Sequence, residues 1–316
     1  MSLTCGALNE NTFTDDNLQE ARLCVACRWW YAAMMRPFLT LILLLALQGC
    51  SAVKLGYQQL PTLSYWWLDS TVSFNSEQSV RAKEALDLLH QWHRREELPR
   101  YVSFLQNQTQ WSLNTAEPAQ LCGAFAEVQN RMDRLMREAV RQAAPLAMLL
   151  GPRQLSHMAR HWEGKNENWE KDWLRGDDQA RMERRVERLM NRYSDFYGSL
   201  NADQSALIKA QLALSPWTAE WGRQDRQRRQ KDLLATLQRV SQSQMPVAQV
   251  EAELWGVWQR WLKPSDPVGA GVMQAMSQQA CNNLSQLHNS TTPEQRQRAT
   301  RRIRAYERDL RDLLLP

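Results

Sequence analysis

The amino-acid sequence predicts an all-α fold, a multi-helix bundle of roughly eight to ten helices without a sheet. The first reason is composition, because 43% of the 316 residues are hydrophobic while Gly and Pro number only 12 each. The second is that apolar residues recur at steps of three and four. The third is a short pattern, typical of helix starts, that recurs along the chain.

Acidic and basic residues are interleaved along the same segments. Lys and Arg number 39 against 34 Asp and Glu, which gives a net charge of +5. Interleaving of this kind is typical of solvated helix faces, whereas a nucleic-acid surface has clustered basic residues. We therefore expect no nucleic-acid partner.

The first distinct segment is a short apolar run, residues 39–47, which is too short to span a membrane. Read from Met35, the stretch MRPFLTLILLLALQGC has one positive charge, an apolar core and a small-residue end. That is the plan of a secretory signal peptide. The final Leu-Gln-Gly-Cys, ending at Cys50, resembles the lipobox of bacterial lipoproteins, although Gln48 stands where a small or β-branched residue is usual.

This resemblance implies that residues 35–49 are removed as a lipoprotein signal peptide and that Cys50 is acylated. Several acyl chains hold a protein firmly on a membrane, because each buried methylene contributes about 0.8 kcal/mol. Ser51 follows the cysteine in place of Asp, which in this class of proteins implies the outer membrane. We expect the mature chain to be anchored there, facing the periplasm.

Residues 1–34 precede this signal peptide. Because a signal peptide normally begins close to its own initiator, we interpret them as an over-extended gene start, with translation beginning at Met34 or Met35. A genuine longer leader is the alternative. The C-x-x-C spacing of Cys24 and Cys27 then lies outside the mature protein, and it lacks the second pair or βαβ context that would indicate metal or redox chemistry.

Residues 50–76 are predicted to be a lipid-anchored tether, and residues 77–316 a helical domain. Four segments share a template in which a capping residue is followed three positions later by Gln. They are Asn75 to Gln78, Gly151 to Gln154, Asn201 to Gln204 and Thr292 to Gln295. An Asn or Thr in this position accepts a hydrogen bond from a free backbone amide, and the Gln reaches back. Each segment predicts a helix start, and a shared role in partner binding is the alternative.

Apolar residues keep helical spacing along the domain. Phe125, Val128, Met132, Leu135 and Ala139 recur at steps of three and four, which predicts one apolar helix face. Such stripes are more often core than binding surface. Residues 263–271, KPSDPVGAG, are predicted to form a loop.

Two cysteines besides Cys50 remain in the predicted mature chain, Cys122 and Cys281. An oxidising periplasm favours a disulfide between them. Both also lie in helical patterns and fit as small buried hydrophobes. The two interpretations stay open at this point.

The chain has five His. His90 and His93 are three positions apart and His157 and His161 four, so each pair lies on one helix face and together they offer a candidate metal site. Met158 stands where the H-E-x-x-H motif needs its glutamate, which excludes the metalloprotease form. No nucleophile elbow, phosphate loop or dinucleotide motif is present, and we expect neither a cofactor nor an enzyme.

The densest run of charged and aromatic residues spans residues 92–101, where a helix is expected to end before Pro99 and a second to begin. The candidate partner-binding residues in it are Trp92, His93, Arg94, Arg95, Arg100 and Tyr101. Exposed aromatic and Arg side chains at a helix junction can form a binding edge. The alternative is a buried corner held by pairs of Arg and carboxylate.

Several segments resemble landmarks of an uncharacterised lipoprotein family of Gram-negative bacteria, a domain of unknown function. They are Leu55 with Tyr57, Trp66 to Asp69, Trp92 to Tyr101, Lys165 to Trp169 and Tyr197 to Asn201. The resemblance implies a helical envelope lipoprotein and supplies no activity or catalytic residue. The helix starts are also weakly similar to those of Spy-like periplasmic chaperones, which are much shorter.

We therefore expect an outer-membrane-anchored lipoprotein that acts as a non-enzymatic helical binding or chaperone-like module. Its partners are then the membrane, through lipid on Cys50, and an envelope protein or client. The alternative is a metal-binding or enzymatic envelope protein that uses the two histidine pairs.

Overall fold

The computed structural model describes residues 49–315, with side chains from residue 53 onward. The chain divides into two units, residues 1–53 and 54–316. The predicted gene start, nearly all of the predicted signal peptide, and Cys24 with Cys27 lie outside the described residues. Of Cys50 only the backbone is described, at the start of α2 (Gly49–Gln58).

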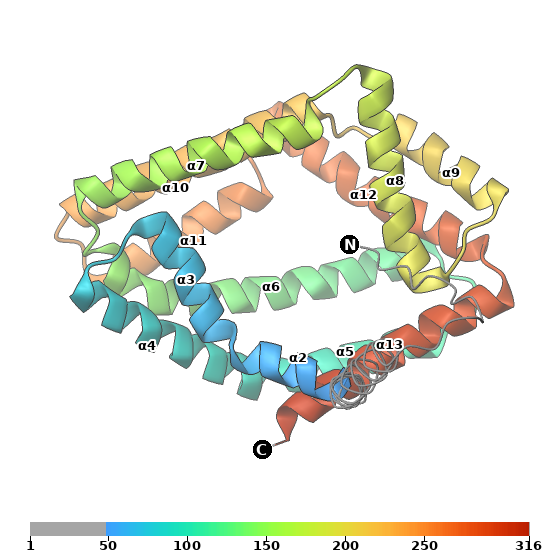
Figure 1. Cartoon of the computed structure of the whole chain (residues 1–316), viewed down its shortest axis with the longest axis horizontal. Coiled ribbons are helices and arrows are strands. Elements are labelled where there is room, and N and C mark those ends of the chain that lie inside the picture. The colour runs from blue at the N-terminus through green and yellow to red at the C-terminus, as the bar shows by residue number, and fades with distance from the viewer. Residues whose placement is uncertain (1–48, 316) are drawn as a thin grey trace, which may run out of the picture. The chain divides into compact units, whose positions relative to one another are not determined.

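From residue 60 to residue 314 the structure has eleven α-helices and one short π-helix, and no strand occurs in the part of the chain that it describes (Figure 1). The all-α prediction is therefore confirmed. The helices are α3 (Leu60–Val72), α4 (Ser76–Trp92), η1 (His93–Glu97), α5 (Leu98–Trp111), α6 (Pro118–Ala147), α7 (Pro152–Trp173), α8 (Asp178–Tyr197), α9 (Ala202–Ala213), α10 (Ala219–Gln242), α11 (Val247–Leu262), α12 (Pro267–Asn289) and α13 (Pro293–Leu314).

The helices pack in two groups that share α6. In the first, α3, α4, α6, α11, α10 and α7 contact one another in that order, and α7 packs back on α3. In the second, α6 contacts α12, which is followed by α9, α8, α13 and α5. Figure 1 shows α7 and α10 lying side by side and α5 lying along α13. The long helix α6 thus borders both groups.

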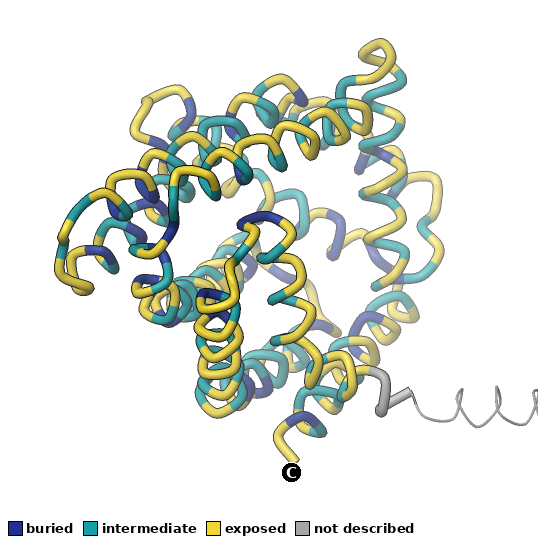
Figure 2. The backbone as a smooth tube through the Cα atoms, turned by 60° about the vertical axis from the view of Figure 1, so that its left-hand side comes forward, coloured by how far each residue is buried: buried dark blue, intermediate teal, exposed yellow. Residues whose placement is uncertain are grey.

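Each group has a buried cluster of its own. The first cluster consists of Val72, Val140, Ala144, Ala147, Leu150, Met158, Leu237, Val240, Val250 and Leu254. The second consists of Tyr197, Ile208, Leu287 and Ala299. Figure 2 shows the buried residues as short stretches, with exposed residues on the other faces of the helices. The helices are therefore one-sided, as the sequence predicted.

The apolar stripe predicted on α6 is only partly covered, with Leu135 and Ala139 half-buried. Phe125, Val128 and Met132 are 37%, 48% and 41% exposed. The buried face of α6 in its second half carries Val140 and the small residues Ala144 and Ala147, whereas Leu121 is a buried residue in line with the stripe. Helical spacing predicted that these residues share a face, but only the neighbouring helices decided which face is covered.

The predicted helix starts are confirmed. Asn75 Oδ1 accepts from the Gln78 backbone amide at 2.9 Å, and Gln78 Oε1 accepts from the Asn75 amide at 3.1 Å. The same two-way box begins α9 and α13. At Gly151, which has no side chain, only the half that Gln154 supplies is present.

The four helix starts also pair with one another. Gln78 Nε2 donates to Gln154 Oε1 at 3.2 Å, and Gln154 Nε2 donates back at 2.7 Å. Gln204 and Gln295 form the same reciprocal pair. The side-chain amide of each Gln also donates to a backbone carbonyl of the helix start it pairs with. In all four cases that carbonyl lies two residues before the capping residue. The same arrangement of two helix starts therefore occurs twice in the fold, between α4 and α7 and between α9 and α13.

Helix α3 belongs to the folded body, although it lies within the segment predicted as a tether. It packs against α4 and α7, and its last residues, Thr71 and Val72, are buried. The predicted boundary at residue 77 falls inside the first turn of α4. The correction has a physical reason, because the partner that covers α3 is α7, eighty residues further along the chain.

The predicted loop at residues 263–271 is shorter than expected, because α12 begins at Pro267. Asp266 Oδ1 accepts from the Gly269 amide at 2.6 Å, and the Pro follows directly as the first helical residue. Proline is favoured there because its missing amide hydrogen would have had no partner. The Pro and Gly residues that suggested a loop are thus a helix start.

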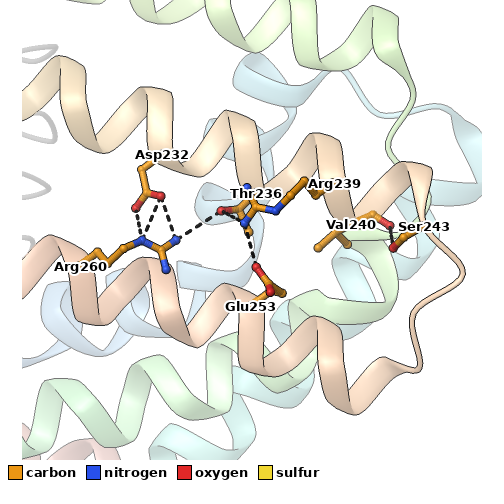
Figure 3. A network of polar contacts seen from close by, with 7 residues as sticks. All are labelled: Asp232, Thr236, Arg239, Val240, Ser243, Glu253 and Arg260. Carbon is orange, nitrogen blue, oxygen red and sulfur yellow. Dashed lines mark hydrogen bonds and ion pairs between the residues drawn. The ribbon is translucent and has the colours of Figure 1, made fainter. Parts of the chain in front are cut away.

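A polar network joins α10 to α11 (Figure 3). Arg260 donates to both carboxylate oxygens of Asp232 at 2.8 to 3.1 Å, and Arg239 bonds Glu253 at 2.8 Å. Both guanidinium groups also approach the buried Thr236 hydroxyl, at 3.4 and 3.2 Å. Two-point pairs of this kind fix orientation as well as adding energy.

Candidate binding surfaces

The stretch of residues 92–101 is one continuous run of helix. Helix α4 passes into the π-helix η1 and then into α5, which starts with Leu98 and Pro99. The expected break before Pro99 does not occur, because a proline is tolerated in a first turn and the wider π-turn precedes it. The junction is therefore a register change within a helix rather than a corner between two.

Glu97 ends η1 and is fully buried, with 0% exposure. Its Oε1 accepts from Arg134 Nε at 2.6 Å and from Arg100 at 3.3 Å. A buried carboxylate needs such partners, because an unpaired charge there would be costly. Arg100 thus pairs with a buried carboxylate, which agrees with the alternative interpretation of this stretch as a corner held by Arg and carboxylate pairs.

Arg94 is also occupied within the molecule. Its guanidinium donates to the backbone carbonyls of Leu313 and Leu315, at 3.0 and 2.7 Å. A cation at a helix C-terminus satisfies free carbonyls and the helix dipole, here at the end of α13. Arg95 pairs with its neighbour Glu96, at 3.1 Å, and is exposed.

His93 and Tyr101 belong to a cluster of rings with Tyr57, a residue that sequence reasoning placed only among family landmarks. The Tyr57 hydroxyl and His93 Nδ1 are 2.9 Å apart, and the His93 and Tyr101 rings 5.4 Å. Burial raises the pKa of Tyr57 to about 12 and lowers the pKa of His93 below its ordinary value. At neutral pH the phenol is therefore protonated and the imidazole neutral, which suits a packing role.

Trp92 points to a different place, a groove of about 600 Å³ between α4, α6 and α11. Arg137 lies over the Trp255 ring in this groove, 3.9 Å from its centre, in the geometry of a cation–π contact. Of the six candidate residues, only Trp92 lines it. Arg137 and Trp255 were missed because more than a hundred residues separate them in the chain.

The two histidine pairs do not converge. His157 and His161 have ring centres 6.4 Å apart, and His157 Nε2 lies 3.1 Å from the Ser70 carbonyl. His90 lies against Tyr57, with ring centres 4.5 Å apart. No group of three or more potential metal ligands occurs among the residues that the structure describes.

A disulfide joins Cys122 on α6 to Cys281 on α12. This resolves the two interpretations that the sequence left open. The bond joins two cysteines that are 159 positions apart in the chain, on helices that pack against each other.

A family model matches residues 70–258, more than half of the chain. The chain belongs to DUF6279, a family of unknown function. No curated protein and no solved structure matches it significantly. The sequence resemblance to a family of unknown function is thus confirmed, and the match carries no statement about lipid attachment.

A group of exposed apolar side chains lies on α3, in the part of that helix that precedes the region matched by DUF6279. Trp66 and Trp67 are 62% and 66% exposed, and Leu60 and Leu63 lie beside them. Positions three and four apart share a helix face, so these side chains form one patch, which we call the α3 patch. Within the described residues, no helix is long and apolar enough to cross a membrane.

Proposed function

We propose that this DUF6279 chain is an outer-membrane lipoprotein, anchored through Cys50, that acts as a non-enzymatic, chaperone-like binding module in the periplasm. The α3 patch is the observation that carries the binding part of this proposal. Large apolar side chains gathered on an otherwise charged surface mark sites where proteins or other apolar partners bind. Tryptophan is the residue most enriched at the energetic centres of such sites.

The anchoring part rests on the lipobox-like sequence before Cys50. Its test is the intact mass of the protein isolated from bacterial membranes, compared with a Cys50→Ser variant. The expected mature protein begins at Cys50 and carries a diacylglyceryl and an acyl group, whereas the variant is neither cut at that bond nor acylated. A chain that keeps residues 1–49 and carries no lipid would contradict this part.

The binding part is tested with mature protein that carries Ser at position 50 and is therefore soluble. The measurement is light scattering by a client that aggregates without reductant, such as citrate synthase diluted out of denaturant, with and without the protein. We expect slower aggregation, and we expect Trp66→Ser with Trp67→Ser to abolish most of the effect, because it removes the centre of the α3 patch.

A matched control is Leu214→Ser with Val268→Ser. Both residues are exposed, at 79% and 75%, and they lie just after α9 and on α12, helices that are not among those packed on α3. This variant should protect the client as well as the parent does. Equal protection by the tryptophan variant, with an unchanged unfolding temperature, would contradict the assignment of binding to α3.

A further inference from the structure

A second groove lies where the end of α7 meets α8, α9 and the segment before α10. It holds about 360 Å³. Three arginines of α8 line it, Arg185, Arg188 and Arg192, together with Trp173 and Trp217. Aliphatic side chains of α8, α9 and α12 complete the lining, and it contains no acidic residue. We call this site the Arg–Trp groove.

The three arginines lie at steps of three and four, which places them on one side of α8. None of them makes an ion pair or a hydrogen bond within the described part of the chain. Their neighbour Arg181, by contrast, bonds Glu220 at 2.5 Å. Burial lowers the pKa of Arg185, as expected for a guanidinium that lacks a carboxylate partner. The groove therefore has uncompensated positive charge.

The two tryptophans hold these guanidinium groups in place. The indole rings of Trp173 and Trp217 meet edge to face, with centres 5.2 Å apart. Arg188 lies 4.3 Å above Trp173, and Arg185 lies 4.9 Å above Trp217. A stacked guanidinium keeps the N–H groups at its edge free to donate.

The backbone makes room for this arrangement at Gly222. A Cβ atom built there would lie 2.8 Å from the Trp217 ring, closer than van der Waals contact permits. A larger residue at this position would therefore displace the Trp217 ring that Arg185 stacks on. The absence of a side chain at Gly222 thus supports the shape of the groove.

We propose that the Arg–Trp groove binds a small phosphate-bearing amphiphile, with the phosphate held by Arg185, Arg188 and Arg192 and the apolar part against Trp173 and Trp217. Guanidinium groups match phosphate oxygens by paired hydrogen bonds. The indole and aliphatic lining suits a chain that follows the phosphate. The volume lies at the low end for small-ligand sites, which run from about 300 to 1,000 Å³. This inference does not depend on the α3 patch or on lipid at Cys50.

The test uses mature protein with Ser at position 50 and isothermal titration calorimetry. The probe is dihexanoyl phosphatidylglycerol below its micelle concentration. Dihexanoyl phosphatidylcholine has the same chains without net charge, and glycerol phosphate has the phosphate without chains. We expect the first probe to bind at least roughly tenfold more tightly than either of the others, because only it offers both features.

Arg188→Gln with Arg192→Gln should weaken binding of the phosphatidylglycerol at least roughly tenfold. The matched control is Arg301→Gln with Arg304→Gln, which removes the same charge from exposed positions of α13 that make no ion pair among the described residues. It should leave the affinity unchanged. Gly222→Ala should also weaken binding, by displacing the Trp217 ring.

Three results would overturn the proposal. The first is equal affinity of the parent and the Arg188, Arg192 variant. The second is glycerol phosphate binding as tightly as the lipid, which would make this a site for a free phosphate. The third is displacement of the phosphatidylglycerol by an acidic peptide such as hexaglutamate at a concentration below that of the lipid.

Discussion

Gln204 and Gln295 hold each other by their side-chain amides: Gln204 Nε2 donates to Gln295 Oε1 at 2.8 Å, and Gln295 Nε2 donates back at 3.0 Å. Each Oε1 also accepts from the amide of its own capping residue, Asn201 or Thr292. Each Nε2 also donates to a backbone carbonyl of the other segment. Both amides thus use two donors and two acceptor sites, their full capacity.

Gln204→Ala is therefore expected to be costly. It removes the half of the capping box that the Gln204 side chain supplies, although Asn201 still caps the helix. It also leaves the partners of a 1% exposed side chain unpaired, at a cost of about 1 to 3 kcal/mol. The measurement is urea unfolding. The matched control is Gln120→Ala on α6, because Gln120 is exposed and bonds only its own capping residue, Glu117. The pairing would be unimportant if both variants lost the same stability.

Ser73→Gly is expected to stabilise the protein. Ser73, the C-cap of α3, has φ 60°, a left-handed conformation, and the C-cap of α8 with a positive φ, 85°, is a glycine, Gly198. A non-glycine residue pays about 1 to 2 kcal/mol for this conformation, partly offset by the greater freedom of an unfolded glycine. A gain of about 0.5 to 1 kcal/mol in urea unfolding is expected, and Gly198→Ser should show a loss.

Reduction of the bond between Cys122 and Cys281 should lower the free energy of unfolding by about 2 to 5 kcal/mol, because the bond closes a long loop. Cys122→Ser with Cys281→Ser should lower it equally, and reductant should then have no further effect. Thiol counting on the unfolded, unreduced protein provides the check. Two reactive thiols from these positions would contradict the disulfide.

Stability should fall as pH decreases from about 7 to about 5. His288 is buried, accepts from the Tyr197 hydroxyl at Nδ1 (3.0 Å) and donates from Nε2 to the Asn114 carbonyl (2.8 Å). Burial lowers its pKa below the ordinary 6.5. The unfolded chain therefore takes up a proton in this range before the native protein does, and protonation favours unfolding.

The readout is the slope of unfolding free energy against pH. His288→Gln should be less stable than the parent at pH 7.5 but should show a smaller slope. Burial also lowers the pKa of His90, His93 and His161, so part of the slope should remain. An unchanged slope in the variant would show that the pKa of His288 is the same in the folded and unfolded protein.

Local patterns were sufficient to predict the helices and their starts. The capping boxes at Asn75, Asn201 and Thr292 are hydrogen bonds within four consecutive residues, so the local sequence is sufficient to predict them. Two errors came from the same source, because Pro99 and Pro267 were taken as interruptions. Both stand in first helical turns, where proline is tolerated.

The candidate surfaces required tertiary structure. Arg94 resembles a free surface charge in sequence, yet it caps the end of α13, over two hundred positions away. The spacing of Phe125, Val128 and Met132 is regular, yet these side chains stay 37% to 48% exposed.

By itself, then, the sequence determined the all-α class, the helix starts and a lipobox-like segment, since these depend on residues within a few turns of each other. Tertiary structure alone decided that Gln204 pairs with Gln295, that Cys122 pairs with Cys281 and that Arg188 lies over Trp173. These contacts join positions far apart in the chain or on different helices. Their formation depends on how whole helices pack, which no local pattern encodes.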